Sequence, residues 1–111
     1  MKTRKEREKE TLKRQILDVA RKLFINNGFE KTSIRSIAEE IEYSPSIIYL
    51  YFKDKNELFY ELHTEAFNSF FSELMGSVIS DNPFDRLEQL GHRYLKFGLE
   101  NPELYNLLFI M

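Results

Sequence analysis

The 111-residue sequence contains no cysteine, only three prolines and four glycines, and no long apolar segment. Without cysteine, the chain can form neither a disulfide framework nor a thiolate metal site, which fits a reducing compartment. The longest apolar run, LLFIM, is far shorter than the roughly 20 residues of a membrane-spanning helix. The first ten residues, MKTRKEREKE, lack the apolar core of a signal peptide. We therefore expect a cytoplasmic protein with no membrane segment.

The residue patterns of common catalytic sites are also missing. There is no glycine-rich phosphate loop, no cysteine nucleophile and no convincing Ser/His/Asp order. The two histidines, His63 and His92, are isolated, with no HExxH motif and no carboxylate at ligand spacing. We therefore predict a protein that is not an enzyme, with no catalytic residue, no metal site and no cofactor.

Charge is distributed unevenly along the chain. Residues 1–35 hold eleven basic and five acidic side chains, a net charge of +6. Residues 63–111 hold three basic and seven acidic side chains, a net charge of −4. A basic front end suits a polyanionic partner such as nucleic acid, although a solvated helix face would look similar.

Hydrophobic periodicity predicts a long first helix, from about residue 8 to Asn27. Its apolar stripe is Leu12, Ile16, Val19, Ala20 and Leu23. Gly28 ends this helix, because glycine readily adopts the left-handed conformation that closes a last turn. Phe29 is then expected to fold back onto Leu23 or Phe24.

Two short helices are predicted next. Thr32 or Ser33 caps the first of them, whose buried face is Ile34, Ile37, Ala38 and Ile41. Residues 42–44 form a turn. Ser44 followed by Pro45 has the order expected at a helix start, and this helix should run through Phe52.

Three more helices are predicted to complete the chain. Asp54 and Glu57 form a capping pair that opens a long helix from about Lys55 to Ser80. Asn82-Pro83 and Asn101-Pro102 repeat the signal of a cap followed by proline. The last helix ends in an apolar run without a polar tail, which predicts that the fold continues beyond residue 111. Three aromatic residues of the long helix are either core or the lining of a ligand pocket: Phe67, Phe70 and Phe71.

Two short helices behind a longer one, joined by a three-residue turn, form the layout of a helix-turn-helix, in which the second short helix enters the major groove. At about 100° per residue, Ile48 and Phe52 face the core. Ser46, Ile47, Leu50 and Tyr51 face the other side, with Tyr49 at the margin. A tyrosine there can lie against sugar and donate its hydroxyl proton to a phosphate oxygen. An isoleucine offers a methyl surface to thymine.

At these residues the sequence resembles the tetracycline-repressor (TetR) family of bacterial one-component regulators. The similar segments are TSIRSIAEEIEYSPSIIYLYFKDKNELF and, upstream, ILDVARKLFINNGFEKTS, which together span about residues 10–60. The resemblance implies a homodimeric repressor or activator that binds a palindromic operator in double-stranded DNA. It also implies that further helices bind a small-molecule effector and, through residues beyond 111, form the dimer.

By position, the resemblance implies that Arg35 reads a base or a phosphate and that Lys55 clamps the DNA backbone. The candidate DNA-binding residues are Thr32, Ser33, Arg35, Ser44, Pro45, Ser46, Ile47, Tyr49, Tyr51 and Lys55. Two positions depart from the family pattern, since Glu42 replaces the usual glycine and Tyr43 the usual valine. A non-glycine residue at this turn must accept a left-handed or strained conformation, or else the turn differs from that of the family.

The predicted fold class is therefore all-α. Residues 1–54 form the helix-turn-helix DNA-binding domain, and residues 55–111 begin a helical effector-binding and dimerisation domain. The alternative is an all-helical protein-interaction module whose basic first helix binds an acidic partner. Only the first reading predicts an affinity for DNA that falls steeply with salt.

Overall fold

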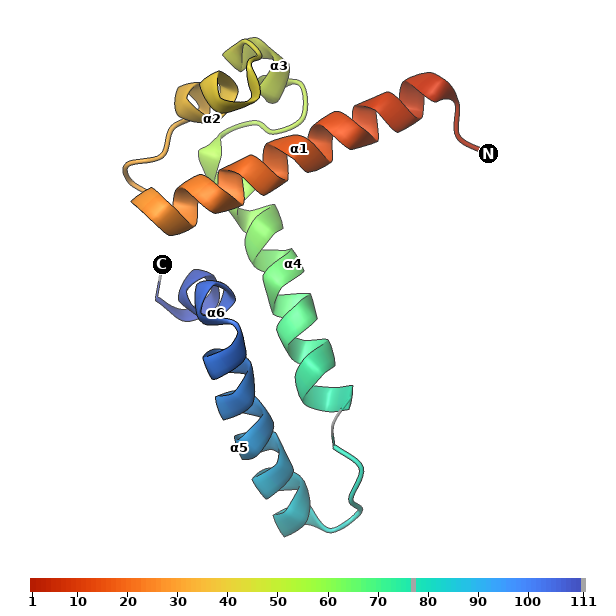
Figure 1. The fold of residues 1–111 in the computed structure, drawn as a ribbon. Helices are drawn as coiled ribbons and strands as arrows, with labels where there is room; N and C mark the ends of the chain where they lie inside the picture. The colour runs from red at the N-terminus through yellow and green to blue at the C-terminus, as the bar shows by residue number, and fades with distance from the viewer. Residues whose placement is uncertain (77, 111) are drawn as a thin grey trace. The chain divides into compact units, whose positions relative to one another are not determined.

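The computed structural model describes residues 1–76 and 78–110 and confirms the all-helical fold class. Six helices follow one another, and no strand occurs among the described residues (Figure 1). The helices are α1 (Arg4–Asn27), α2 (Ile34–Ile41), α3 (Pro45–Tyr49), α4 (Lys55–Gly76), α5 (Pro83–Glu100) and α6 (Pro102–Phe109). The chain divides into two compact units, Met1–Leu62 and His63–Met111, so α4 contributes to both.

Helix α1 begins four residues earlier than its apolar periodicity predicted. Thr3 occupies the N-cap, where its hydroxyl accepts the N–H of Glu6 and the Glu6 carboxylate accepts the N–H of Thr3. This capping box satisfies two backbone donors at the helix start. The first eleven residues are exposed, so the opening turns of α1 lie outside the core of unit 1.

The core of unit 1 joins α1, α2, α3 and the start of α4. In Figure 1, α2 and α3 lie together on one side of α1. The buried side chains are Ile16, Leu17, Ala20, Phe24, Ile34, Ile37, Ala38, Ile41, Ile48, Phe52, Leu58 and Leu62. The predicted inner face of α2 is confirmed, whereas on α1 the buried row runs through Ile16, Ala20 and Phe24, and Leu23 is only half-buried.

An aromatic cluster closes the loop between α1 and α2. Gly28 ends α1 with a positive φ of 88° and donates its N–H to the Phe24 carbonyl. Phe29 then folds back, as predicted, to 5.6 Å from the Phe24 ring, and both rings contact Phe59 at 5.4 and 5.1 Å. Edge-to-face pairs at these separations contribute beyond their buried area. The cluster ties the end of α1 to the start of α4 within unit 1.

Helix α3 is shorter than predicted and ends at Tyr49 instead of Phe52. The N–H groups of Leu50 and Tyr51 bond to carbonyls three residues back, at Ile47 and Ile48, which marks a tightened turn after the helix. The chain then turns so that Phe52 enters the core, where it is 1% exposed.

Helix α4 starts as predicted and ends earlier. The Asp54 carboxylate accepts the N–H of Glu57 at 2.8 Å, as in a capped first turn. The helix extends to Gly76, and residues 78–80 are not helical, so it is shorter than the predicted span to Ser80. Ser77, within the predicted span, lies outside the described residues.

In unit 2, aromatic side chains connect α4, α5 and α6. The Phe70 ring lies 5.9 Å from Tyr94, 4.9 Å from Phe97 and 5.5 Å from Phe109. The predicted start of α5 is confirmed, because the Asn82 side chain accepts the N–H groups of Phe84 and Asp85. None of the described helices has both the length and the apolar composition needed to cross a membrane.

Candidate nucleic-acid interface

The turn between α2 and α3 contains a left-handed residue, which is one of the conformations that the sequence left open. Glu42 has φ 63° and ψ 37°. Its N–H bonds to the Glu39 carbonyl at 3.2 Å, and the N–H of Tyr43 bonds to the Ala38 carbonyl at 3.0 Å. These two bonds define a Schellman motif, which satisfies the last carbonyls of α2 and redirects the chain into α3.

Replacing Glu42 with glycine is expected to stabilise the protein. A left-handed conformation costs a residue with a Cβ about 1–2 kcal/mol, and the greater freedom of glycine when unfolded offsets part of that gain. We expect the free energy of unfolding to rise by about 0.5–1 kcal/mol, which is a few degrees in Tm. Glu42→Gln is the matched control, because it removes the charge and keeps the strain. An equal rise for both variants in thermal melts would assign the effect to the charge.

The side chains predicted to contact DNA are mostly at the surface around α3. Ser33, Arg35, Ser44, Ser46 and Tyr49 are exposed, Tyr49 by 54%. Pro45, Ile47, Tyr51 and Lys55 are half-buried. The exposed set presents one guanidinium, several hydroxyls and an aromatic ring, which are the groups that bind phosphate oxygens and base edges.

The hydroxyls of the three serines are held in local bonds. The Ser33 side chain caps α2 by accepting the N–H of Ser36 at 3.0 Å. The hydroxyls of Ser44 and Ser46 bond to each other at 2.8 Å, so Ser44 occupies the N-cap position without capping α3 through its side chain. Since one bond uses only one of these two protons, the Ser44–Ser46 pair retains a donor for an external acceptor.

The hydroxyl of Thr32 is used inside the domain. Thr32 is 1% exposed, and its Oγ1 lies 2.8 Å from the Gly28 carbonyl and 3.1 Å from the Leu23 carbonyl. The N-cap that the sequence left open between Thr32 and Ser33 is Ser33. Thr32 instead stabilises the connection from α1 to α2, so its side chain is not part of the exposed surface.

The ammonium group of Lys55 is also held within unit 1. Its Nζ donates to the Phe29 carbonyl at 2.7 Å and lies 4.0 Å from the centre of the Phe29 ring. A cation over an aromatic face is attracted by the ring quadrupole. These contacts explain a lysine at the start of α4, where the helix dipole disfavours positive charge.

Residues near the turn that were not predicted as site residues are also exposed. The Tyr43 ring is 46% exposed, although the sequence marked this position only as a departure from the family pattern. Lys31 in the loop before α2 and Lys53 in the loop after α3 are exposed as well. The sequence could have identified these three residues because each lies within two positions of a predicted contact.

The three candidate ligand-binding phenylalanines of α4 fall into two environments within unit 2. Phe70 is half-buried among the rings of α5 and α6. Phe67 and Phe71 stack on each other at 6.2 Å and are 48% and 54% exposed. Beside Phe70, the Tyr94 hydroxyl donates to the Tyr105 hydroxyl at 3.2 Å, and this bond raises the pKa of Tyr94.

The left-handed turn, the capped α2 and the half-buried α3 define unit 1 as a helix-turn-helix domain. Residues 16–62 match the family model described as bacterial regulatory proteins, tetR family. These residues are therefore identified as a TetR-family domain. This agrees with the resemblance that its sequence motifs indicated.

The chain is also similar to bacterial transcriptional regulators. The chain is 40% identical over 68 residues to the HTH-type transcriptional repressor Rv1474c of Mycobacterium tuberculosis, covering 61% of this chain and 34% of that protein. It is 43% identical over 51 residues to the HTH-type transcriptional regulator QacR of Staphylococcus aureus, covering 46% and 27%. The solved structure of a TetR-like transcriptional regulator from Rhodococcus sp. RHA1 matches with a TM-score of 0.72 and 28% identity, covering 97% and 57%. The chain thus spans about a quarter to three fifths of the length of these relatives.

Proposed function

We propose that this chain is a sequence-specific, ligand-responsive transcriptional repressor that binds a palindromic operator in duplex DNA as a homodimer. The observation that carries the proposal is the exposed surface of the helix-turn-helix. Arg35 is exposed on α2, Ser46 and Tyr49 are exposed on α3, and Ile48 of α3 is buried in the core. Two such heads, related by a two-fold axis, would match the symmetry of a palindromic site.

The proposed contacts are of two kinds: some recognise bases, and others position the domain on the phosphate backbone. Arg35 is exposed on the first turn of α2, and its guanidinium can bond two acceptors of one guanine. Tyr49 and the Ser44–Ser46 pair present hydroxyls suited to phosphate oxygens. Half-buried Ile47 offers methyl groups to the major groove. Thr32 and the ammonium of Lys55 have roles inside the domain and are left out of the proposed interface.

Effector binding is proposed for unit 2. Support comes from the aromatic side chains that α4 directs toward α5 and α6, of which Phe70 has the most ring contacts. Rings of this kind line many small-molecule sites. The relatives are named as regulators and a repressor, which supports repression as the direction of control.

Selection from a random pool of DNA duplexes tests the function directly. The expected result is enrichment of one palindromic sequence, bound in retention assays with two chains per duplex. Recovery of no preferred sequence, together with retention that does not depend on salt, would contradict DNA recognition and favour the protein-interaction alternative.

Arg35 and Tyr49 are expected to affect recognition differently. Arg35→Ala should cost about 1–3 kcal/mol on the selected duplex and much less on random duplex, because a bidentate guanine contact is lost. Tyr49→Phe, which removes only a hydroxyl, should weaken both duplexes about equally. Fluorescence anisotropy on the two duplexes measures both effects. Equal losses on both duplexes for Arg35→Ala would make Arg35 a backbone contact.

A further inference from the structure

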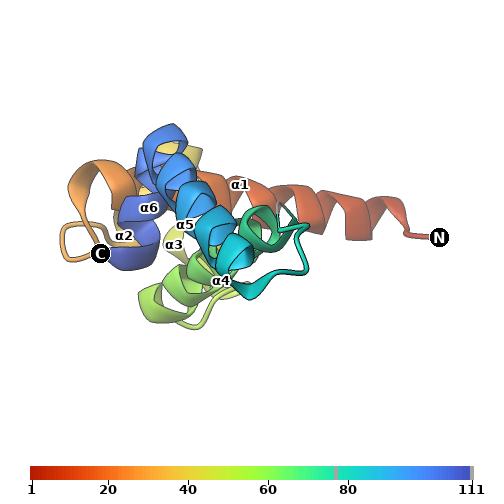
Figure 2. The same ribbon diagram turned by 90° about the horizontal axis from the view of Figure 1, so that it is seen from below.

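The first turns of α1 form a charged arm outside the core. The first buried residue of α1 is Ile16, whereas residues 1–11 are all exposed. Figure 2 shows the N-terminal part of α1 projecting beyond the other helices of unit 1. The capping box at Thr3 and the ion pairs of Lys2 with Glu10 and Arg4 with Glu8 hold this arm helical. The first turns of α1 are therefore a helical segment that adds nothing to the buried core.

Two lysines of the arm continue the core-facing stripe of α1. Counting back from Ile16 by helical steps of four, three and four gives Leu12, Lys9 and Lys5. Leu12 is half-buried, and both lysines are exposed. Lys5 and Lys9 are also four residues apart, a spacing at which like charges destabilise a helix. Helix stability does not explain this pair, whereas a polyanion bound along it would.

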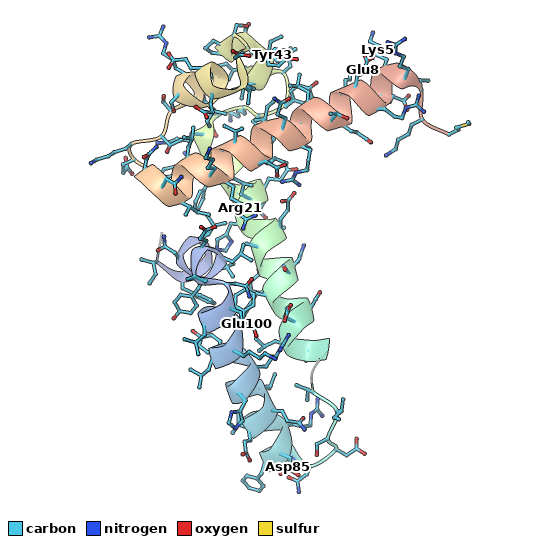
Figure 3. All side chains as sticks on the ribbon, viewed as in Figure 1. Lys5, Glu8, Arg21, Tyr43, Asp85 and Glu100 are labelled. Carbon is cyan, nitrogen blue, oxygen red and sulfur yellow. The ribbon has the colours of Figure 1, made fainter. Side chains whose placement is uncertain are left out.

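The arm and the helix-turn-helix line an open groove of about 610 Å³. Its lining residues are Arg4, Lys5, Arg7, Glu8, Lys9, Thr11, Leu12, Gln15, Tyr43 and Tyr51. Four of them are cations and one is an acid, already paired with Arg4 at 3.1 Å. In Figure 3, the labelled Lys5 and Tyr43 lie on the same side of unit 1.

The neighbouring face of α1 has a different charge. The hollow beside it is lined by Arg7, Glu10, Arg14 and Asp18 among others, with as many acids as cations. Arg14 is paired with Asp18 at 3.0 Å. Positive potential is therefore concentrated on the groove side of the arm, toward Tyr43 and Tyr51.

From these features we infer that the groove binds the phosphodiester backbone of duplex DNA just outside the half-site read by α3. Lysine and arginine neutralise the phosphates, and the Tyr43 and Tyr51 hydroxyls supply donors on the opposite wall. The inference rests on the proposed DNA-binding function and extends its footprint. Residues that do not read bases thereby add affinity and salt dependence.

The test uses the full chain and the duplex selected from the random pool, in two forms. One form is unmodified, and the other carries neutral methylphosphonates in place of the phosphates flanking the half-sites. Lys5→Gln with Lys9→Gln removes two charges from the groove, and Arg86→Gln with Lys96→Gln removes two charges from α5 as the matched control. On the unmodified duplex, the groove variant should lower the slope of log affinity against log salt by about 1.8 per bound chain. The control should leave the slope unchanged, and on the methylphosphonate duplex the groove variant should bind like the unmutated chain.

Three results would overturn the inference. The first is an equal loss for the groove and control variants, and the second is an unchanged loss on the methylphosphonate duplex. The third is a loss of binding to poly-glutamate or to anionic phospholipid vesicles without a loss on DNA, which would assign the groove to another polyanion. Failure of the unmutated chain to select any duplex is a separate result, and it would overturn the proposed function itself.

Discussion

Affinity for duplex DNA is expected to fall by about 10³ to 10⁵ between 50 and 200 mM salt, the loss expected for six to ten phosphate contacts. Each of two heads can supply three to five of these contacts, because Lys31 and Lys53 are exposed on unit 1 and the groove adds further cations. Each neutralised phosphate releases condensed counterions, and added salt opposes this release. Titrations of a labelled duplex at several salt concentrations give the slope directly.

This salt dependence separates the two interpretations of the charge asymmetry. Eleven of the sixteen basic residues lie in the first 35 positions, while residues 63–111 carry a net charge of −4. If the basic helix only stays solvated, or binds an acidic protein, DNA retention will be weak and nearly flat in salt. A flat response in the presence of the selected duplex would therefore contradict DNA binding, whatever the family of the domain.

Local capping signals made most of the fold predictable. Gly28, Asn82 and the serine that precedes α2 end or begin helices where the sequence indicated, because each side chain or conformation acts on backbone groups within a few residues. The start of α1 was missed because the first eleven residues have no apolar periodicity. The signal that remained was the Thr3-x-x-Glu6 capping box, which needs no buried face.

The candidate site was less predictable because two of its residues are occupied by distant or buried partners. Lys55 bonds to the Phe29 carbonyl across 26 positions of the chain, a contact that no local pattern encodes. The hydroxyl of Thr32 bonds to carbonyls at the end of α1, whereas in sequence Thr32 and Ser33 are equivalent caps. The left-handed conformation of Glu42 was one of several that the sequence left open, because a glutamate at this position neither favours nor excludes it as clearly as glycine would.

The same substitution at the two adjacent isoleucines of α3 is expected to affect different properties: protein stability at Ile48 and DNA affinity at Ile47. Ile48 is fully buried, so Ile48→Ala should lower the free energy of unfolding by about 2–5 kcal/mol through lost burial and a residual cavity. Since α3 is only five residues long and rests on this side chain, its order should be lost with it. Denaturant melts measure the stability of this variant.

Ile47→Ala is the matched control, with the same chemistry one position away on the half-buried outer side of α3. It should lower the free energy of unfolding by much less than Ile48→Ala does, because the Ile47 side chain is only partly removed from water on folding. It should lower the affinity for the selected duplex, because a methyl contact to thymine is lost. The slope of log affinity against log salt should stay the same, since no charge is removed. Large destabilisation by Ile47→Ala, or full stability of Ile48→Ala, would mean that α3 packs on its other face, and the assignment of its groove-facing side would then be wrong.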